Sequence, residues 1–143
     1  MKSPQRSATG RNYTIMSKGE EKIARLLKQA QIDYERERSF QDLRHKKYRY
    51  DFYLPVQNII IEFHGQQHYQ YTSYFYKSQT DFKAACERDR KKISYALANH
   101  KPIYIIPYYD LDKITCAADL FNPLYLAKSR WHVDDDRRRH NWL

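Results

Sequence analysis

The sequence predicts an α/β fold with a small mixed sheet flanked by helices, and three observations predict it. An amphipathic helical pattern comes first, at residues 17–30. Strand-like segments with alternating or β-branched residues fill much of residues 33–63. A longer helical pattern at residues 78–99 is followed by one more apolar strand. A chain of 143 residues can bury one modest core, so we expect a single layered domain.

The first helix has a clear start signal. Ser17 can cap it, and Glu20 three residues later completes a capping-box pattern. Apolar residues such as Ile23 and Leu27 follow at helical spacing. Residues 1–15 are predicted to be a basic arm, residues 33–40 a charged strand, and residues 41–47 a basic turn.

Residues 48–63 predict a β-hairpin. The first strand, residues 48–54, is rich in aromatic residues and alternates, with Tyr50, Phe52 and Leu54 expected on one buried face. The second strand, residues 58–63, is β-branched, and Pro55 precedes the turn. On this second strand Ile59, Ile61 and Phe63 should share one face and Ile60, Glu62 and His64 the other.

The second half of the chain is predicted to complete the layers. The long helix should bury a stripe made of Phe82, Cys86, Ile93 and Leu97, with Asp89 on the same stripe. A buried strand is expected at residues 103–108 and a short helix within residues 113–130. The folded domain is then residues 16–130, and residues 131–143 are a charged tail with helical pairs such as Asp134–Arg138.

Composition narrows the function classes. The formal net charge of +9 favours a polyanionic partner, with nucleic acid first and a membrane surface as the weaker alternative. No apolar run has the length of a transmembrane helix, and the first residues lack the apolar core of a secretion signal. Cys86 and Cys116 lie far apart and outside any metal-binding spacing, which favours two reduced thiols in a cytoplasmic protein.

The hairpin also predicts a pair of facing acids. If Leu54 lies opposite Ile59, the antiparallel register puts Asp51 opposite Glu62. Like charges at opposed positions are destabilising, so a cation between them is expected. Carboxylate oxygens suit a hard divalent ion, which makes Mg²⁺ the predicted cofactor and Mn²⁺ its substitute. The alternative is a pair of solvated edge charges neutralised by Arg49 or Lys47.

Two further acids have both a functional and a structural interpretation. Glu20 lies at the end of the buried stripe of the first helix, where it could reach the same metal site or position a water. Simple capping of the helix is the alternative, and the spacing alone slightly favours it. Asp89 needs a partner on its apolar stripe. It is either a group that orients the site or half of an internal pair with Lys92 or an arginine.

The segment after Glu62 holds three polar candidates: His64, Gln67 and His68. A histidine beside a metal could act as a general base, as a general acid or as a phosphate donor. Ordinary hydrogen bonding in a polar loop is the alternative. A zinc site built on His64 and His68 is a further alternative, but the sequence pattern lacks a third soft ligand for it.

Two basic runs flank the predicted site and are candidate contacts to nucleic-acid phosphates. Lysine and arginine supply salt-dependent affinity, and tyrosines between the runs can stack on bases or wedge between them. A solvated charged face is the alternative for each run taken alone. The predicted DNA-binding residues are Arg44, Lys46, Lys47, Arg88, Arg90, Lys91 and Lys92, and the intervening tyrosines are Tyr69, Tyr71, Tyr74 and Tyr76.

The ordered motifs SKGEEKIARLL, RYDFYLP, IIIEFHGQQHY, ERDRKKISYA and PIYIIPY resemble the PD-(D/E)XK restriction-endonuclease-like superfamily. Within it the pattern is similar to phage-type and homing endonucleases and to very-short-patch repair endonucleases, over residues 17–112. The resemblance implies a restriction-endonuclease-like core in which Glu20 is an acid from the first helix and Asp51 and Glu62 are the metal ligands. In the repair branch it also implies that His64 and His68 assist catalysis and that Arg88 and Asp89 form a pair.

The sequence departs from the superfamily pattern at two positions. Tyr50 stands where the motif has proline, and His64 stands where it has lysine. The positive group that stabilises the transition state must then come from His64, Gln67 or Lys92.

The expected function is a Mg²⁺-dependent DNA endonuclease that hydrolyses phosphodiester bonds. Its partner is duplex or branched DNA, and cutting both strands would need a homodimer or a higher homo-oligomer. The alternatives are a structure-specific nuclease on branched DNA, the same chemistry on RNA, or a non-catalytic DNA-binding protein on a degraded nuclease scaffold. The expected location is the cytoplasm of a bacterial or phage-infected cell. Homing, recombination, repair and restriction are the alternatives for its role, and the sequence does not choose among them.

Overall fold

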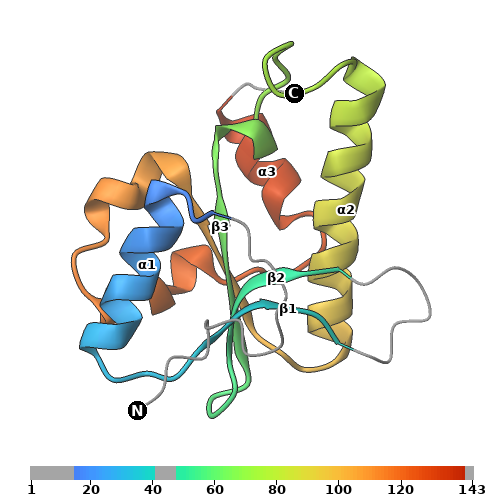
Figure 1. Cartoon of the computed structure of the whole chain (residues 1–143). Coiled ribbons are helices and arrows are strands. Elements are labelled where there is room, and N and C mark those ends of the chain that lie inside the picture. The colour runs from blue at the N-terminus through green and yellow to red at the C-terminus, as the bar shows by residue number, and fades with distance from the viewer. Residues whose placement is uncertain (1–14, 41–47, 141–143) are drawn as a thin grey trace.

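A computed structural model describes residues 15–40 and 48–140 of the chain (Figure 1). The predicted α/β class is confirmed: a four-stranded mixed sheet lies between helices. The basic turn at residues 41–47, with Arg44, Lys46 and Lys47, lies outside the described residues, as does the N-terminal arm up to residue 14. No helix of the described part combines the length and the apolar character needed to cross a membrane.

The sheet has the strand order β1-β2-β3-β4. The antiparallel part comprises β1 (Glu35–Arg38), β2 (Tyr50–Leu54) and β3 (Ile59–His64). β4 (Ile103–Pro107) runs parallel to β3, and the long helix α2 (Gln79–Ala98) makes the crossover between them. The inner strand β3 therefore has neighbours on both sides, and its C-terminal end leads directly into the segment that carries the histidines.

The predicted register of the hairpin is confirmed, because Leu54 pairs with Ile59. Asn58 closes the turn: its backbone N–H donates to the carbonyl of Leu54 at 2.7 Å, and its φ of 61° is the left-handed conformation that asparagine tolerates. The short turn fixes the register of the two strands. The residues that follow in register are consequently held opposite one another.

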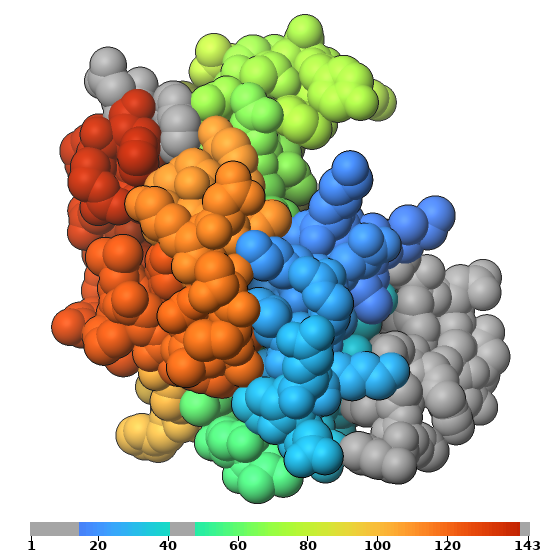
Figure 2. Space-filling view, turned by 90° about the vertical axis from the view of Figure 1, so that its left-hand side faces the viewer, coloured from blue at the N-terminus to red at the C-terminus, as the bar shows by residue number. Residues whose placement is uncertain are grey.

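Two apolar clusters cover the two faces of the sheet. On one face α1 (Lys18–Gln29) packs with a series of 3-10 turns, η2 (Tyr108–Lys113), η3 (Ala117–Phe121) and η4 (Pro123–Tyr125). On the other face lie α2 and α3 (His132–Arg139). Figure 2 shows the 3-10 turns beside α1. It also shows a recess between the start of that helix and the tyrosine-rich segment at residues 69–76. The short helix predicted within residues 113–130 is present as the two 3-10 helices η3 and η4, with no α-helix in this stretch.

The predicted alternation of β3 is confirmed, with Ile61 in the cluster under α1 and Ile60 in the cluster under α2. Tyr50 differs from the prediction. It packs in the α2 cluster rather than beside Phe52 and Leu54, and its hydroxyl donates to the carbonyl of Lys92 at 2.9 Å. This hydrogen bond connects the start of β2 to the middle of α2.

The cap predicted for the first helix is confirmed, since Ser17 and Glu20 form the reciprocal capping box of α1. Ser78 caps α2. The inner stripe of α2 is also as predicted, except that Ala96 is buried in place of the half-buried Leu97. The charged tail contains α3, and its Asp134 pairs with Arg137 and Arg90 rather than with Arg138.

Candidate active site

Asp51 and Glu62 lie side by side at the end of the β2–β3 ladder. The backbone N–H of Asp51 donates to Glu62 Oε2 at 2.9 Å, and the backbone N–H of Phe63 donates to Asp51 Oδ2 at 2.8 Å. Each carboxylate is thus bound by the backbone of the opposite strand, beyond the last backbone pair, Phe52 with Ile61. The structure brings together the two acids that the register predicted.

Lys92, on α2, is the cation that accompanies this pair. Its Nζ lies 2.9 Å from Glu62 Oε1, and Nε2 of His64 lies 3.6 Å from the same oxygen. Arg49 instead pairs with Glu37, so the described residues do not show it neutralising the two acids. Glu62 is only 3% exposed, which rules out a solvated edge charge.

The electrostatics of the pair are unequal. Burial and the neighbouring Glu62 charge raise the pKa of Asp51 well above its usual value. Burial also acts to raise the pKa of Glu62, but Lys92 and His64 outweigh it and lower that pKa to about 2. One lysine charge therefore does not offset the two carboxylates. A divalent cation would supply the missing positive charge and favour the ionised form of Asp51.

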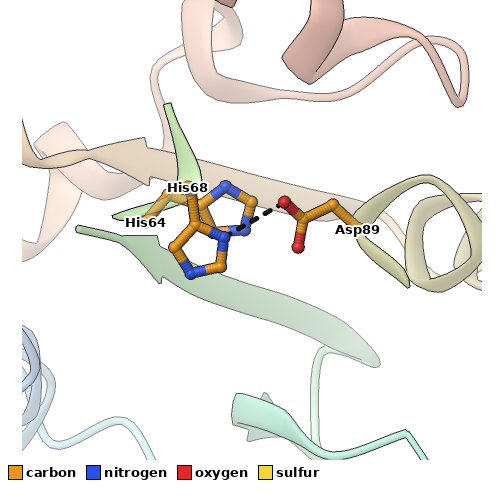
Figure 3. A group of neighbouring side chains, drawn as sticks. All are labelled: His64, His68 and Asp89. Carbon is orange, nitrogen blue, oxygen red and sulfur yellow. Dashed lines mark hydrogen bonds and ion pairs between the residues drawn. The ribbon is translucent and has the colours of Figure 1, made fainter. Parts of the chain in front are cut away.

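His64, His68 and Asp89 form a second group beside the acids (Figure 3). The imidazole rings of His64 and His68 are stacked, with centroids 3.9 Å apart and an interplanar angle of 8°. His68 Nδ1 lies 3.1 Å from Asp89 Oδ2. Because an ionised carboxylate only accepts hydrogen bonds, Nδ1 of His68 carries a proton in this contact.

The surroundings keep His64 neutral and Asp89 ionised. Burial and the neighbouring His68 lower the pKa of His64 to about 4. The pKa of Asp89 lies far below its usual value: burial opposes this, but His68, His64 and Arg137 outweigh it. A neutral imidazole beside an ionised carboxylate can accept a proton and remain stable as a cation.

The same three residues could also hold a transition metal, since one ligand atom from each lies within 4.8 Å of the others. Asp89 adds a third ligand to the two histidines, although its carboxylate is a hard ligand and not the soft one that the sequence pattern lacked. Nδ1 of His64 is buried without a hydrogen-bond partner among the described residues, so it is available to a proton or a cation. Oδ2 of Asp89, however, already accepts from His68 and from Arg137. The observed arrangement is a chain of hydrogen bonds rather than a coordination shell.

The capping role predicted for Glu20 is confirmed, and its charge also acts on Asp51. Its Oε1 accepts the backbone N–H of Ser17 at 3.0 Å, which is the cap, and its charge contributes to raising the pKa of Asp51. Arg36 of β1, which the sequence did not single out, lies 3.9 Å from Glu20. Its Nε and Nη2 are buried and have no hydrogen-bond partner in the described part of the chain. In a strand reading ERER, nothing in the pattern distinguishes the buried arginine from the other.

A cleft of about 390 Å³ opens beside the histidines. Of the predicted phosphate contacts, Arg88 and Lys92 line it, whereas Arg90 is engaged by Asp134 and Glu87 and Lys91 is exposed elsewhere on α2. Gln67 also lines the cleft. Its walls are Tyr48, Arg49, Gln67, His68, Tyr76, Ala85, Arg88, Asp89 and Lys92. The wall therefore carries three cationic side chains, and one of them, Lys92, contacts Glu62 of the acid pair.

The predicted stacking tyrosines divide into two kinds. Tyr69 is buried, Tyr71 is half-buried and Tyr76 donates its hydroxyl to the carbonyl of Gln67. Tyr74 is 87% exposed and lies against the exposed ring of Phe75. Only the Tyr74–Phe75 pair presents open aromatic surface in this loop.

The residue that sequence reasoning missed most clearly is Arg137. Asp89 pairs with the guanidinium of Arg137 and not with Arg88 or Lys92. The one available signal was the position of Asp89 on an apolar stripe, which required a partner without naming it. Comparisons with protein-family models, with curated proteins and with solved structures found no match to this chain.

Proposed function

We propose that this protein is a metal-dependent DNA endonuclease of the restriction-endonuclease-like type. The observation that carries the proposal is the pair Asp51 and Glu62, bound to each other's strands and accompanied by Lys92 from α2. An acid pair with an adjacent lysine is the set of groups that the resembled superfamily uses. The lysine missing after Glu62 in the sequence would be supplied here from the helix.

Asp51 and Glu62 would hold the ion, with Glu20 completing its surroundings directly or through water. A bound Mg²⁺ polarises a phosphate oxygen and lowers the pKa of a coordinated water. The ammonium of Lys92 would stabilise negative charge developing on the phosphate. His68, with its Nδ1 held by Asp89, would present Nε2 to accept or return a proton.

The surface near this site suits a nucleic-acid backbone. Arg49, Arg88 and Lys92 line the cleft beside the acids, and the whole chain carries a net charge of +9. Tyr74 and Phe75 offer exposed rings for stacking on bases. One such site cuts one strand, so double-strand cleavage would require a homodimer or a higher homo-oligomer.

Nicking of a supercoiled plasmid tests the proposal. We expect cleavage with Mg²⁺ or Mn²⁺, none with EDTA, and none from the variants Asp51→Asn and Asp51→Ala. Asp112→Asn removes an exposed aspartate and serves as the matched control that should cut normally. The Asp51 variants should still bind DNA and unfold near the wild-type temperature, because the change relieves repulsion with Glu62. Wild-type rates from Asp51→Asn would refute the proposal.

One observation favours a second candidate, a non-catalytic DNA-binding protein on a nuclease scaffold. Lys92 already contacts Glu62, and an internal ammonium can take the place of a metal in neutralising that carboxylate. In that case the protein would bind DNA but would not cut linear, nicked, mismatched or branched duplexes with any divalent ion. The same panel of substrates, extended to RNA, would identify a preference for branched DNA or for RNA.

A further inference from the structure

Arg137 of α3 is fully buried and binds three groups at once. Its Nε donates to the carbonyl oxygen of His68, its Nη2 to Asp89 Oδ2 and its Nη1 to Asp134 Oδ1, each at 2.7 Å. A planar guanidinium presents its donors in a rigid fork, so these three bonds fix the relative positions of the three acceptors.

Two of the three acceptors belong to the His68–Asp89 pair. Asp89 Oδ2 receives both Arg137 and His68 Nδ1, and Arg137 also holds the backbone of His68 itself. The imidazole is thus held at two points, its ring through Asp89 and its main chain directly. Asp89 and the His68 main chain are thus both bound by one side chain, that of Arg137, from near the C-terminal end of the chain.

We infer that Arg137 is a positioning residue for the proposed nuclease reaction, so this inference rests on the proposed function. By keeping Asp89 ionised and aimed at His68 Nδ1, Arg137 selects the tautomer whose Nε2 is free to exchange a proton. Groups that orient a working histidine through such a bond commonly change activity by about 10- to 100-fold when they are removed.

A purely structural role makes a different prediction. Asp134 and Asp89 are two buried acids, and Arg90 and Arg137 are the two arginines that neutralise them. Arg90 binds both carboxylate oxygens of Asp134. If Arg137 served only charge balance, breaking its bond to Asp134 would have the same effect as breaking its bonds to Asp89 and His68.

Four variants separate the two roles. Arg137→Gln removes the charge and the fork, and Arg137→Lys keeps the charge on a group that cannot reach all three acceptors in one plane. Asp134→Asn disturbs the same buried network without touching Asp89 or His68. Arg138→Gln removes the neighbouring exposed arginine, which pairs only with Asp135 among the described residues.

For each variant, three quantities would be measured: the unfolding temperature, the cleavage rate of the folded protein and the ¹⁵N resonances of the His68 ring. The resonances report the tautomer directly and are recorded at about pH 8.5, where histidine side chains are ordinarily neutral. Arg137→Gln should slow cleavage by about 10- to 100-fold with mixed His68 tautomers. Arg137→Lys should fall between Arg137→Gln and the wild type. Asp134→Asn should lose stability but keep both the rate and the tautomer, and Arg138→Gln should match the wild type.

Equal rate losses in Asp134→Asn and Arg137→Lys would show a structural role and overturn the inference. So would a wild-type His68 tautomer in Arg137→Lys. If Arg137→Gln does not fold, Arg137→Lys carries the test. If the wild-type protein does not cut DNA, the proposed function fails by itself, while the resonances still decide whether Arg137 orients His68.

Discussion

At the candidate site one ammonium group, that of Lys92, interacts with two carboxylates, those of Glu62 and Asp51. The pKa of Lys92 is raised: burial acts to lower it, but Glu62 and Asp51 outweigh burial. Lys92 therefore stays charged and keeps Glu62 ionised, while Asp51 remains the acid that lacks compensation. The proposed metal site would thus be asymmetric, with one ligand already paired and the other in need of a cation.

His64 predicts a pH dependence of stability. Its pKa is about 4 in the folded protein and about 6.5 in an unfolded chain, and the charged or titratable groups facing it are Glu62, His68 and Asp89. The stabilising effect of neutral His64 is complete above about pH 6.5 and is lost as the pH falls toward 4. This contribution of His64 to the free energy of unfolding is at most about 3 kcal/mol.

We expect urea titrations in EDTA to show a steeper loss of unfolding free energy below about pH 6.5 in the wild type than in His64→Asn. The variant removes the group that must be protonated on unfolding and leaves Glu62 and Asp89 in place. Parallel stability curves for the two proteins would contradict the assignment of this titration to His64.

The acid pair could be predicted from the sequence, whereas its supporting residues could not. A period of two residues and a short turn determine which side chains of β2 and β3 face each other, so Asp51 and Glu62 follow from the local pattern. Arg137 is one of three consecutive arginines. Which of them points inward depends on how α3 docks on α2, and that is a tertiary property.

At the scale of the elements, helix α1 approaches strand β3 closely at a glycine, Gly19. A Cβ placed on Gly19 would lie 2.3 Å from the ring of Phe63, so the helix can sit this near the strand only because residue 19 has no side chain. Gly19 immediately precedes Glu20. The same contact therefore sets how far the Glu20 carboxylate stands from Asp51.

Gly19→Ala is expected to destabilise the protein by about 1 to 3 kcal/mol through overpacking, even though alanine is the better helix former. Chemical denaturation measures the change. In a Phe63→Leu background the same substitution should cost little, because the smaller side chain makes room. An equal cost in both backgrounds would show that the Phe63 ring is not what the new methyl group meets.

The predictability of the elements follows the strength of their local signals. Capping serines and helical spacing mark α1 and α2, and alternation marks β2 and β3. Residues 113–130 carry no such signal, and local bonds decide their form: Asn122 accepts the N–H of Leu124, and Asp119 accepts that of Thr115. Tyr50 lies on the face opposite to the predicted one, where its hydroxyl donates to the carbonyl of Lys92.

At the scale of the whole molecule, both the layer class and the positive charge could be inferred from the sequence. Helical and strand-like periods set the class, but the docking of α3, which seats Arg137 behind His68, depends on contacts that no local pattern encodes. The placement of charge is likewise visible only in the fold. It brings Arg49 and Arg88 from different elements to one cleft.

DNA binding should depend steeply on salt, and Arg88 should contribute one step of that dependence. Arg88→Gln is expected to lower affinity on all duplex sequences and to make the slope of log K against log salt less negative by about 1. Lys28→Gln, an exposed change at the far end of α1, is the matched control and should leave the slope unchanged. Fluorescence anisotropy across a salt series gives both slopes. Equal slopes for Arg88→Gln and the wild type would remove Arg88 from the contact surface.

The ion pairs within α3 have a consequence for the field around the protein. Asp134, Asp135 and Asp136 are each matched by the arginine three positions later. The six charges sum to zero, so their combined electrostatic field is negligible beyond a Debye length of about 10 Å. For all its arginines, this helix attracts no distant polyanion, and the excess of nine positive charges belongs to the rest of the chain.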